Sequence, residues 1–150
     1  MNPRVFMVDN EKAILEVCEK IFDLNEIDLM GTAENGDEAI RKFKAMSNRP
    51  DLVIMDQRMP LKDGVTTMKE MHEIDPSTKV LFLSADIRAE TKKSALRGGA
   101  IGFIDKPFSI SELITAVRTA IQAVAGTEID GGKSEERGCN FFYQELDRMK

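Results

Sequence analysis

Four short runs of apolar residues constrain the fold of this chain more than any other feature. The runs are Val5–Val8, Leu52–Met55, Val80–Leu83 and Ile101–Ile104. Each run is apolar throughout rather than alternating with polar residues, which is the pattern of strands buried on both faces of a parallel sheet. A fifth, weaker strand is predicted near 27–33. The sequence therefore predicts five strands enclosed between layers of helices.

The segments between these runs show the spacing of amphipathic helices. The apolar residues that share a helical face are, segment by segment, Ala13, Ile14, Val17, Cys18, Ile21 and Phe22; Ala39, Ile40, Phe43 and Met46; Val65, Met68, Met71 and Ile74; and Ile110, Leu113, Ile114, Val117, Ile121 and Val124. The last helix is expected to begin with a capping box formed by Ser109 and Glu112. A more weakly amphipathic segment, 87–98, ends at a pair of glycines, which favours a helix stop.

Strand and helix thus alternate five times over about 125 residues. This alternation predicts a doubly wound α/β fold, with a five-stranded parallel sheet and five helices. In such folds the ligand site lies outside the carboxyl ends of the strands, where the strand order reverses. The residues that follow the strands are therefore the first candidates for function.

Polar side chains follow each of the four strong strands. They are Asp9-Asn10, Asp56, Ser84 and Asp105-Lys106-Pro107. Carboxylate and amide oxygens suit Mg²⁺, which is usually held by one or two carboxylates together with water and phosphate oxygens. An ammonium group such as that of Lys106 can neutralise a transferred phosphoryl group. The strand ends together predict a site for Mg²⁺ and a phosphoryl group.

Four segments resemble the motifs of response-regulator receiver domains, the partners of sensor histidine kinases. The matching segments are Val8–Glu11, Met55–Pro60 with Asp63-Gly64, Leu83–Ala85, and Lys106–Phe108. The resemblance covers roughly residues 3 to 125. It implies a flavodoxin-like strand order of 2-1-3-4-5. It also implies a signalling domain that catalyses only its own phosphorylation and dephosphorylation.

The resemblance assigns the acceptor and the metal ligands. Asp56 would accept the phosphoryl group and form an aspartyl phosphate. Asp9, Asn10 and the Asp56 carboxylate would hold Mg²⁺, together with the backbone carbonyl of Arg58.

The same resemblance assigns the phosphoryl-binding and switch residues. Ser84 and Lys106 would each bind a phosphoryl oxygen, and Phe103 would turn inward when the domain is activated. From the residues alone, Phe103 is equally well a packing residue of the core. The resemblance also implies a cis peptide bond before Pro107.

Asn10 departs from the family pattern, which usually has a second acidic residue at this position. An amide oxygen still binds a hard cation, but one negative charge is missing, and ligand charge tunes the affinity of such sites. We therefore predict weaker Mg²⁺ binding than in a relative with two acids. Asn10 also leaves open a receiver-like protein that binds partners without being phosphorylated.

The chain is expected to comprise a receiver domain at 1–125, a polar linker at 126–138 and a short amphipathic tail at 139–150. The start lacks a secretory pattern and no apolar run is long enough to cross a membrane, so we expect a cytoplasmic protein. Cys18 and Cys139 lack metal-ligand spacing, and Cys18 is predicted to be a reduced core thiol. A net charge of −5 argues against direct binding of nucleic acid.

The expected partners are a sensor histidine kinase or a phosphotransfer protein, and a target protein or a missing output domain. The sequence leaves a homodimer open. One alternative is that the chain is the amino-terminal receiver of a larger regulator. Another is a phosphatase with an aspartyl nucleophile, but such enzymes carry a second acid two residues after the nucleophile, where this chain has Arg58.

Overall fold

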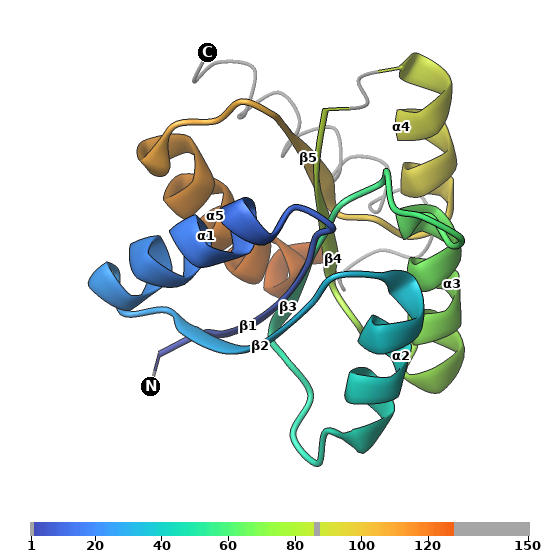
Figure 1. Ribbon diagram of the computed structural model, residues 1–150, viewed down its shortest axis with the longest axis horizontal. Coiled ribbons are helices and arrows are strands. Elements are labelled where there is room, and N and C mark those ends of the chain that lie inside the picture. Colours follow the sequence, from blue (N-terminus) through green and yellow to red (C-terminus); the bar gives the residue numbers. More distant parts are fainter. Residues whose placement is uncertain (1, 86–87, 128–150) are drawn as a thin grey trace.

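The computed structural model describes residues 2–85 and 88–127, the last five of these by their helical backbone alone, and shows a three-layer α/β sandwich (Figure 1). The strands are β1 (Arg4–Val8), β2 (Asp28–Ala33), β3 (Leu52–Met55), β4 (Val80–Ser84) and β5 (Gly102–Asp105). The helices are α1 (Lys12–Leu24), α2 (Gly36–Ala45), α3 (Gly64–Ile74), α4 (Ala89–Arg97) and α5 (Ile110–Thr127). The predicted alternation of five strands and five helices is confirmed.

All strand pairs in the sheet are parallel, and the strand order is β2-β1-β3-β4-β5. This order confirms the flavodoxin-like topology that the resemblance implied. The chain first adds β2 on one side of β1 and then adds β3, β4 and β5 on the other. The reversal leaves a switch point at the carboxyl ends of β1 and β3, where doubly wound folds place their ligands.

The helices cover both faces of the sheet, with α1 and α5 on one side and α2, α3 and α4 on the other (Figure 1). Successive residues of a strand point to opposite faces. In β1, Val5 and Met7 belong to the core beneath α1 and α5, whereas Phe6 and Val8 belong to the core beneath the other helices. Because both faces are covered, the strands need apolar residues at every position, which explains their unbroken apolar runs.

Cys18 lies in the core beneath α1, where its side chain is fully buried. Burial, with a smaller contribution from the nearby charge of Asp9, raises the pKa of its thiol to about 12. A thiol of this kind is not a reactive thiolate at neutral pH. The prediction of a free, buried thiol is confirmed, while Cys139 lies outside the described residues.

Three residues predicted to lie on apolar helical faces, Ala13, Val17 and Ile110, are instead exposed. Val17 in α1 is 50% exposed and Ile110 is 59% exposed. The buried face of α1 is formed by Leu15, Cys18, Ile21 and Phe22. Val17 lies to one side of this face. Ile110 is the first residue of α5 and precedes Leu113, the first buried residue of that helix.

The starts of three helices are capped by side chains. Asn35 accepts a hydrogen bond from the Glu38 amide at 2.8 Å, and Asp63 accepts one from the Thr66 amide at 2.9 Å. At α5, Ser109 Oγ accepts from the Glu112 amide at 3.0 Å, which is one half of the predicted capping box. Such contacts satisfy amides that have no partner within the helix.

The last helix ends at Thr127, so its final residues overlap the start of the expected linker. The remainder of that linker and the predicted tail, 128–150, lie outside the described residues. Within 2–85 and 88–127, no helix has the length and apolar character needed to span a membrane.

Candidate functional site

The candidate site lies at the carboxyl edge of the sheet, where several strand ends meet. Asp9 follows β1, Asp56 follows β3, Ser84 ends β4 and Lys106 follows β5. Backbone hydrogen bonds hold these ends together, since the Asp56 amide donates to the Val8 carbonyl at 2.9 Å and the Lys106 amide donates to the Ser84 carbonyl at 3.0 Å. The parallel sheet therefore brings together residues that are up to 97 positions apart in the sequence.

Asp9 and Lys106 form the closest ion pair of the site. Lys106 Nζ lies 2.7 Å from Asp9 Oδ2 and 3.8 Å from Asp56 Oδ2. The other oxygen of Asp9 accepts a hydrogen bond from the Glu11 amide at 2.8 Å. Asp9 is completely buried, and a buried carboxylate is tolerated only when it is paired and hydrogen-bonded. Lys106 also reaches the more exposed Glu11 carboxylate at 3.2 Å.

Asp56 is a buried carboxylate with a raised pKa. Only 3% of the residue is exposed. Burial and the charge of Asp9 raise the pKa of Asp56 to about 6, while Lys106 and a backbone hydrogen bond from Arg58 act in the opposite direction. Two carboxylates in one buried site repel each other, and a bound cation would relieve that repulsion. The electrostatics of this edge thus favour a positive charge between Asp9 and Asp56.

Asn10 and Arg58 complete a ring of polar atoms around Asp56. The Asn10 amide nitrogen donates hydrogen bonds to Asp56 Oδ2 at 2.9 Å and to the Arg58 backbone carbonyl at 3.2 Å. This orientation follows from the neighbours, because the reverse would face the amide oxygen toward two acceptors. The structure therefore brings the four predicted metal ligands to one place.

The composition of this set fits Mg²⁺. It combines two carboxylates with an amide oxygen and a backbone carbonyl, all hard oxygen ligands. Within the described part of the chain, no three side chains of His, Cys, Asp or Glu gather as a metal-binding group. A cation here would consequently depend on Asn10 and on the Arg58 carbonyl as well as on the two aspartates.

The loop between β3 and α3 is folded tightly against Asp56. The Gly64 amide donates to the Gln57 carbonyl at 3.0 Å, and the Gln57 side chain accepts from the Val65 amide at 2.9 Å. A Cβ atom on Gly64 would lie only 2.3 Å from the Asp56 backbone oxygen. Gly64 is thus required for close approach, and Gln57 positions the loop. Residue spacing does not reveal the role of Gln57, because its partner is a backbone amide.

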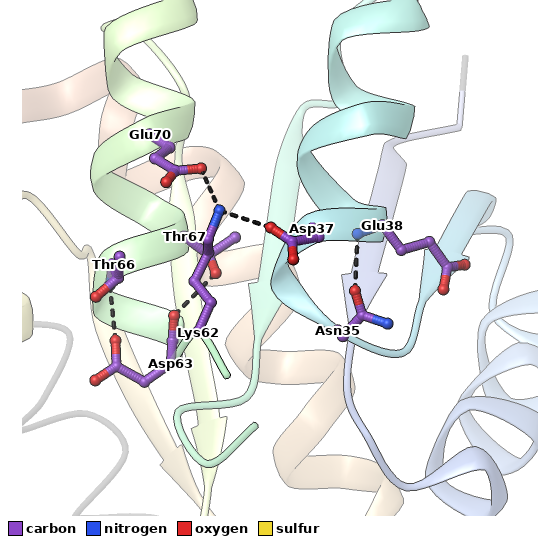
Figure 2. Close-up of polar contacts among 8 residues, drawn as sticks. All are labelled: Asn35, Asp37, Glu38, Lys62, Asp63, Thr66, Thr67 and Glu70. Carbon is purple, nitrogen blue, oxygen red and sulfur yellow. Dashed lines mark hydrogen bonds and ion pairs between the residues drawn. The ribbon is translucent and has the colours of Figure 1, made fainter. Parts of the chain in front are cut away.

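Lys62 ties the same loop to two helices (Figure 2). Its ammonium lies 2.9 Å from Asp37 Oδ1 in α2 and 2.7 Å from Glu70 Oε2 in α3. Next to it, Thr67 Oγ1 donates to the Asp63 carbonyl at 2.8 Å (Figure 2). Sequence reasoning missed this ion-pair cluster because Asp37 and Lys62 meet only through the packing of α2 against α3.

Ser84 and Phe103 lie on neighbouring strands. Ser84 is 1% exposed and pairs in the sheet with Asp105. The Phe103 ring is buried and stacks on Phe82, with the two ring centres 5.1 Å apart. In this structure Phe103 is therefore a packed core residue. The peptide bond between Lys106 and Pro107 is cis, the isomer that the resemblance implied.

A surface cavity of about 450 Å³ opens beside Asn10 and Arg58. Its lining residues are Asn10, Gln57, Arg58, Met59, Pro60, Asp63 and Arg88. Asp56 itself does not line this cavity, but Asn10, which does, contacts the Asp56 carboxylate.

Comparison with known proteins identifies the family. The profile of the response regulator receiver domain matches residues 5–118. Chemotaxis protein CheY of Bacillus subtilis is 33% identical over 121 residues, which make up 81% of this chain and 99% of that protein. The transcriptional regulatory protein PrrA of Mycobacterium tuberculosis is 32% identical over 126 residues, which cover 84% of this chain but 53% of PrrA.

Solved structures agree with this assignment. A chain of the CheX-CheY-BeF3-Mg²⁺ complex from Borrelia burgdorferi superposes with a TM-score of 0.74 at 29% identity, covering 78% of this chain and 87% of that chain. The receiver domain of the Francisella response regulator 1452 gives a TM-score of 0.71 at 33% identity, covering 81% of this chain and 98% of that chain.

Proposed function

This chain belongs to the response regulator receiver family of two-component signalling, and we propose that it receives a phosphoryl group on Asp56 from a histidine kinase or phosphotransfer protein in a Mg²⁺-dependent reaction. One observation carries the proposal: buried Asp56 lies with Asp9 and Lys106 at a single sheet edge, beside a cavity open to solvent. The family consists of signalling domains rather than turnover enzymes. The roles of the individual residues below are part of the proposal.

In the proposed reaction the ionised Asp56 carboxylate attacks the phosphorus of a phosphohistidine. The new bond joins an Asp56 oxygen to phosphorus, and the phosphorus–nitrogen bond breaks, with its electron pair returning to the donor imidazole. Mg²⁺ bound to this ligand set would screen the repulsion between the acceptor and the phosphoryl oxygens. The Ser84 hydroxyl donates to one phosphoryl oxygen.

Lys106 supplies the charge that stabilises the product. Its ammonium is bound mainly to Asp9, at 2.7 Å, and is 1.1 Å farther from Asp56, at 3.8 Å. Asp9 would hold Mg²⁺ as well as this ammonium, so Lys106 would be freer to pair with the phosphoryl group on Asp56 when the metal is bound. Metal binding and phosphoryl stabilisation are thereby linked through one side chain.

The signal passes to a protein partner through a conformational change that includes Ser84 and Phe103. The Borrelia structure is a complex of CheY with CheX, BeF3 and Mg²⁺. This composition supports a protein target and a magnesium site for this chain. PrrA, which is about twice as long as the matched region, supports the alternative that an output domain belongs to the same regulator. The phosphatase alternative is disfavoured because Arg58, two residues after Asp56, is not an acid.

The test is to incubate the protein with acetyl phosphate and Mg²⁺ and to follow its intact mass. We expect one added phosphoryl group on the wild type and none on Asp56→Asn. The control is Asp28→Asn, which makes the same change at an exposed position at the start of β2 and should still be phosphorylated.

Other outcomes of this experiment count against the proposal. Steady release of inorganic phosphate without an adduct would indicate a phosphatase. Lack of an adduct, even with a cognate kinase, would indicate a domain that only binds its partners. An adduct that still forms on the Asp56→Asn protein would show that another residue accepts the phosphoryl group.

A further inference from the structure

Asn10 does more in this structure than reduce the charge of the metal site. Its amide nitrogen is bound to Asp56 Oδ2 and to the Arg58 carbonyl, at 2.9 and 3.2 Å. These two oxygens are the same atoms that the proposed function assigns to Mg²⁺. The amide therefore supplies hydrogen-bond donors at the position where the cation would supply charge.

A carboxylate at position 10 could not act in this way. It carries no donor, and it would face Asp56 Oδ2 and a carbonyl oxygen at hydrogen-bonding distance. Together with Asp9 and Asp56, it would place three acidic groups at one edge with Lys106 as the ammonium between them. Such a site would depend on a cation, because a further negative charge at the exposed position 10 would repel the buried Asp9 and Asp56 carboxylates.

The amide can also serve the occupied site. Mg²⁺ holds its oxygen ligands at about 2.0–2.1 Å, so neighbouring oxygens of one octahedral shell lie about 2.9 Å apart. The terminal amide atom of Asn10 is already at that separation from Asp56 Oδ2. A half-turn of the amide group would exchange nitrogen for oxygen without moving the side chain elsewhere.

We propose that the Asn10 amide is a built-in substitute for the cation. In the metal-free protein its nitrogen donates to Asp56 and to the Arg58 carbonyl, and on metal binding the amide turns so that its oxygen faces the ion. The inference rests on the metal site of the proposed function. In this proposal Asn10 stabilises the site when no Mg²⁺ is bound and supplies an oxygen ligand when it is.

The first test measures thermal unfolding of the full chain in EDTA. We expect the Tm of Asn10→Asp to lie about 5 °C below that of the wild type, with Asn10→Ala in between. The matched control is Asn35→Asp, which adds the same charge at the α2 cap, where an aspartate still accepts from the Glu38 amide. Its Tm should stay near that of the wild type.

The second test adds Mg²⁺. We expect a larger rise in Tm for Asn10→Asp than for the wild type, and about tenfold tighter binding. In the wild type, nitrogen-15 NMR should show the Asn10 side-chain amide protected from solvent exchange in EDTA, with that protection lost on titration with Mg²⁺. The Asn10 signals are identified by their absence in Asn10→Ala.

The outcomes separate this inference from the proposed function. Equal Tm values in EDTA for the wild type, Asn10→Ala and Asn10→Asp would overturn the substitute role, even if Mg²⁺ raises all three. A Mg²⁺ titration that changes neither the Tm nor the Asn10 amide signals would overturn both the inference and the metal site. Failure of phosphorylation by acetyl phosphate, with the expected Tm order and amide signals, would overturn the acceptor chemistry alone.

Discussion

At the scale of single residues, the site is governed by how two buried carboxylates are kept in one place. Asp9 binds the Lys106 ammonium and a backbone amide, whereas Asp56 accepts from the Asn10 amide at 2.9 Å and lies 3.8 Å from the Lys106 ammonium. Burial and then the charge of Asp9 nevertheless raise the pKa of Asp56 to about 6. A buried carboxyl whose pKa is raised beside a second charged group is a candidate for a reactive residue.

The raised pKa predicts a pH dependence of metal-free stability. Between the ordinary carboxyl pKa of 3.8 and about 6, the folded protein binds a proton on Asp56 that the unfolded chain releases. The stabilisation from this proton is complete below the lower value and is lost as the pH rises through the upper one. The Asp56→Asn protein has no carboxyl group at this position and does not lose stability in this way. Its free energy of unfolding, relative to that of the wild type, should therefore increase with pH.

We expect this relative gain to be on the order of 1–3 kcal/mol between about pH 4 and about pH 7. Urea denaturation of both proteins in EDTA measures it, with Asp28→Asn as the surface control. A difference between Asp56→Asn and the wild type that does not vary with pH would show that Asp56 titrates normally.

At the scale of elements, the β3–α3 connection positions Asp56, the proposed phosphoryl acceptor. Its conformation is held by Gln57 within the loop and by Lys62, whose ammonium links α2 to α3. Leu61 between them has a positive φ of 69° and a fully exposed side chain. The loop therefore presents the Arg58 carbonyl toward Asn10 through contacts on both of its sides.

The first residue of α3 gives a prediction at this scale. Gly64→Ala would place a methyl group 2.3 Å from the Asp56 backbone oxygen and 2.8 Å from the Phe82 ring. The backbone beside the acceptor cannot yield without moving Asp56, so we expect a destabilisation of about 2–3 kcal/mol and a marked loss of phosphorylation.

Urea denaturation and the intact-mass assay measure these two effects. The control is Gly31→Ala in β2, where the added methyl would meet only the Phe6 ring, at an ordinary contact distance of 3.5 Å. A Gly64→Ala protein with wild-type stability and phosphorylation would show that the loop can shift away from Asp56 at little cost.

At the scale of the whole molecule, one sheet separates two apolar cores, and the site lies at the edge where both meet. Among the described residues, the fully or nearly buried apolar side chains lie between Val5 and Ala120. The family profile ends at residue 118, and CheY of Bacillus subtilis consists almost entirely of the matched region. The described part of the chain thus contains the parts that a receiver needs.

We therefore predict that a chain ending at Thr127 folds and accepts a phosphoryl group. Its Tm should lie within about 4 °C of the full chain, a difference of roughly 1 kcal/mol. Thermal unfolding and the intact-mass assay with acetyl phosphate test this directly. If the truncated protein is unfolded or cannot be phosphorylated, the functional unit extends past the predicted domain end at residue 125.

The sequence by itself determined the architecture and the candidate site. Continuous apolar runs identify strands covered on both faces, and parallel strands bring their carboxyl ends to one edge. The sequence therefore groups the residues at these strand ends, Asp9, Asp56, Ser84 and Lys106, and the motif resemblance implies the strand order. These features depend on local periodicity and on simple topology, which a single sequence displays.

Tertiary structure decided which groups are partners and which surfaces are covered. Several contacts depend on distances between residues that lie far apart in the chain. They are the ion pair of Lys106 with Asp9, the hydrogen bonds of the Asn10 amide and the ion pairs of Lys62. The exposure of Val17 likewise depends on how α1 is rotated against the sheet. Such features depend on how whole helices and strands pack, and small differences in their angles and separations change them. The spacing of residues in the sequence does not encode these angles and separations.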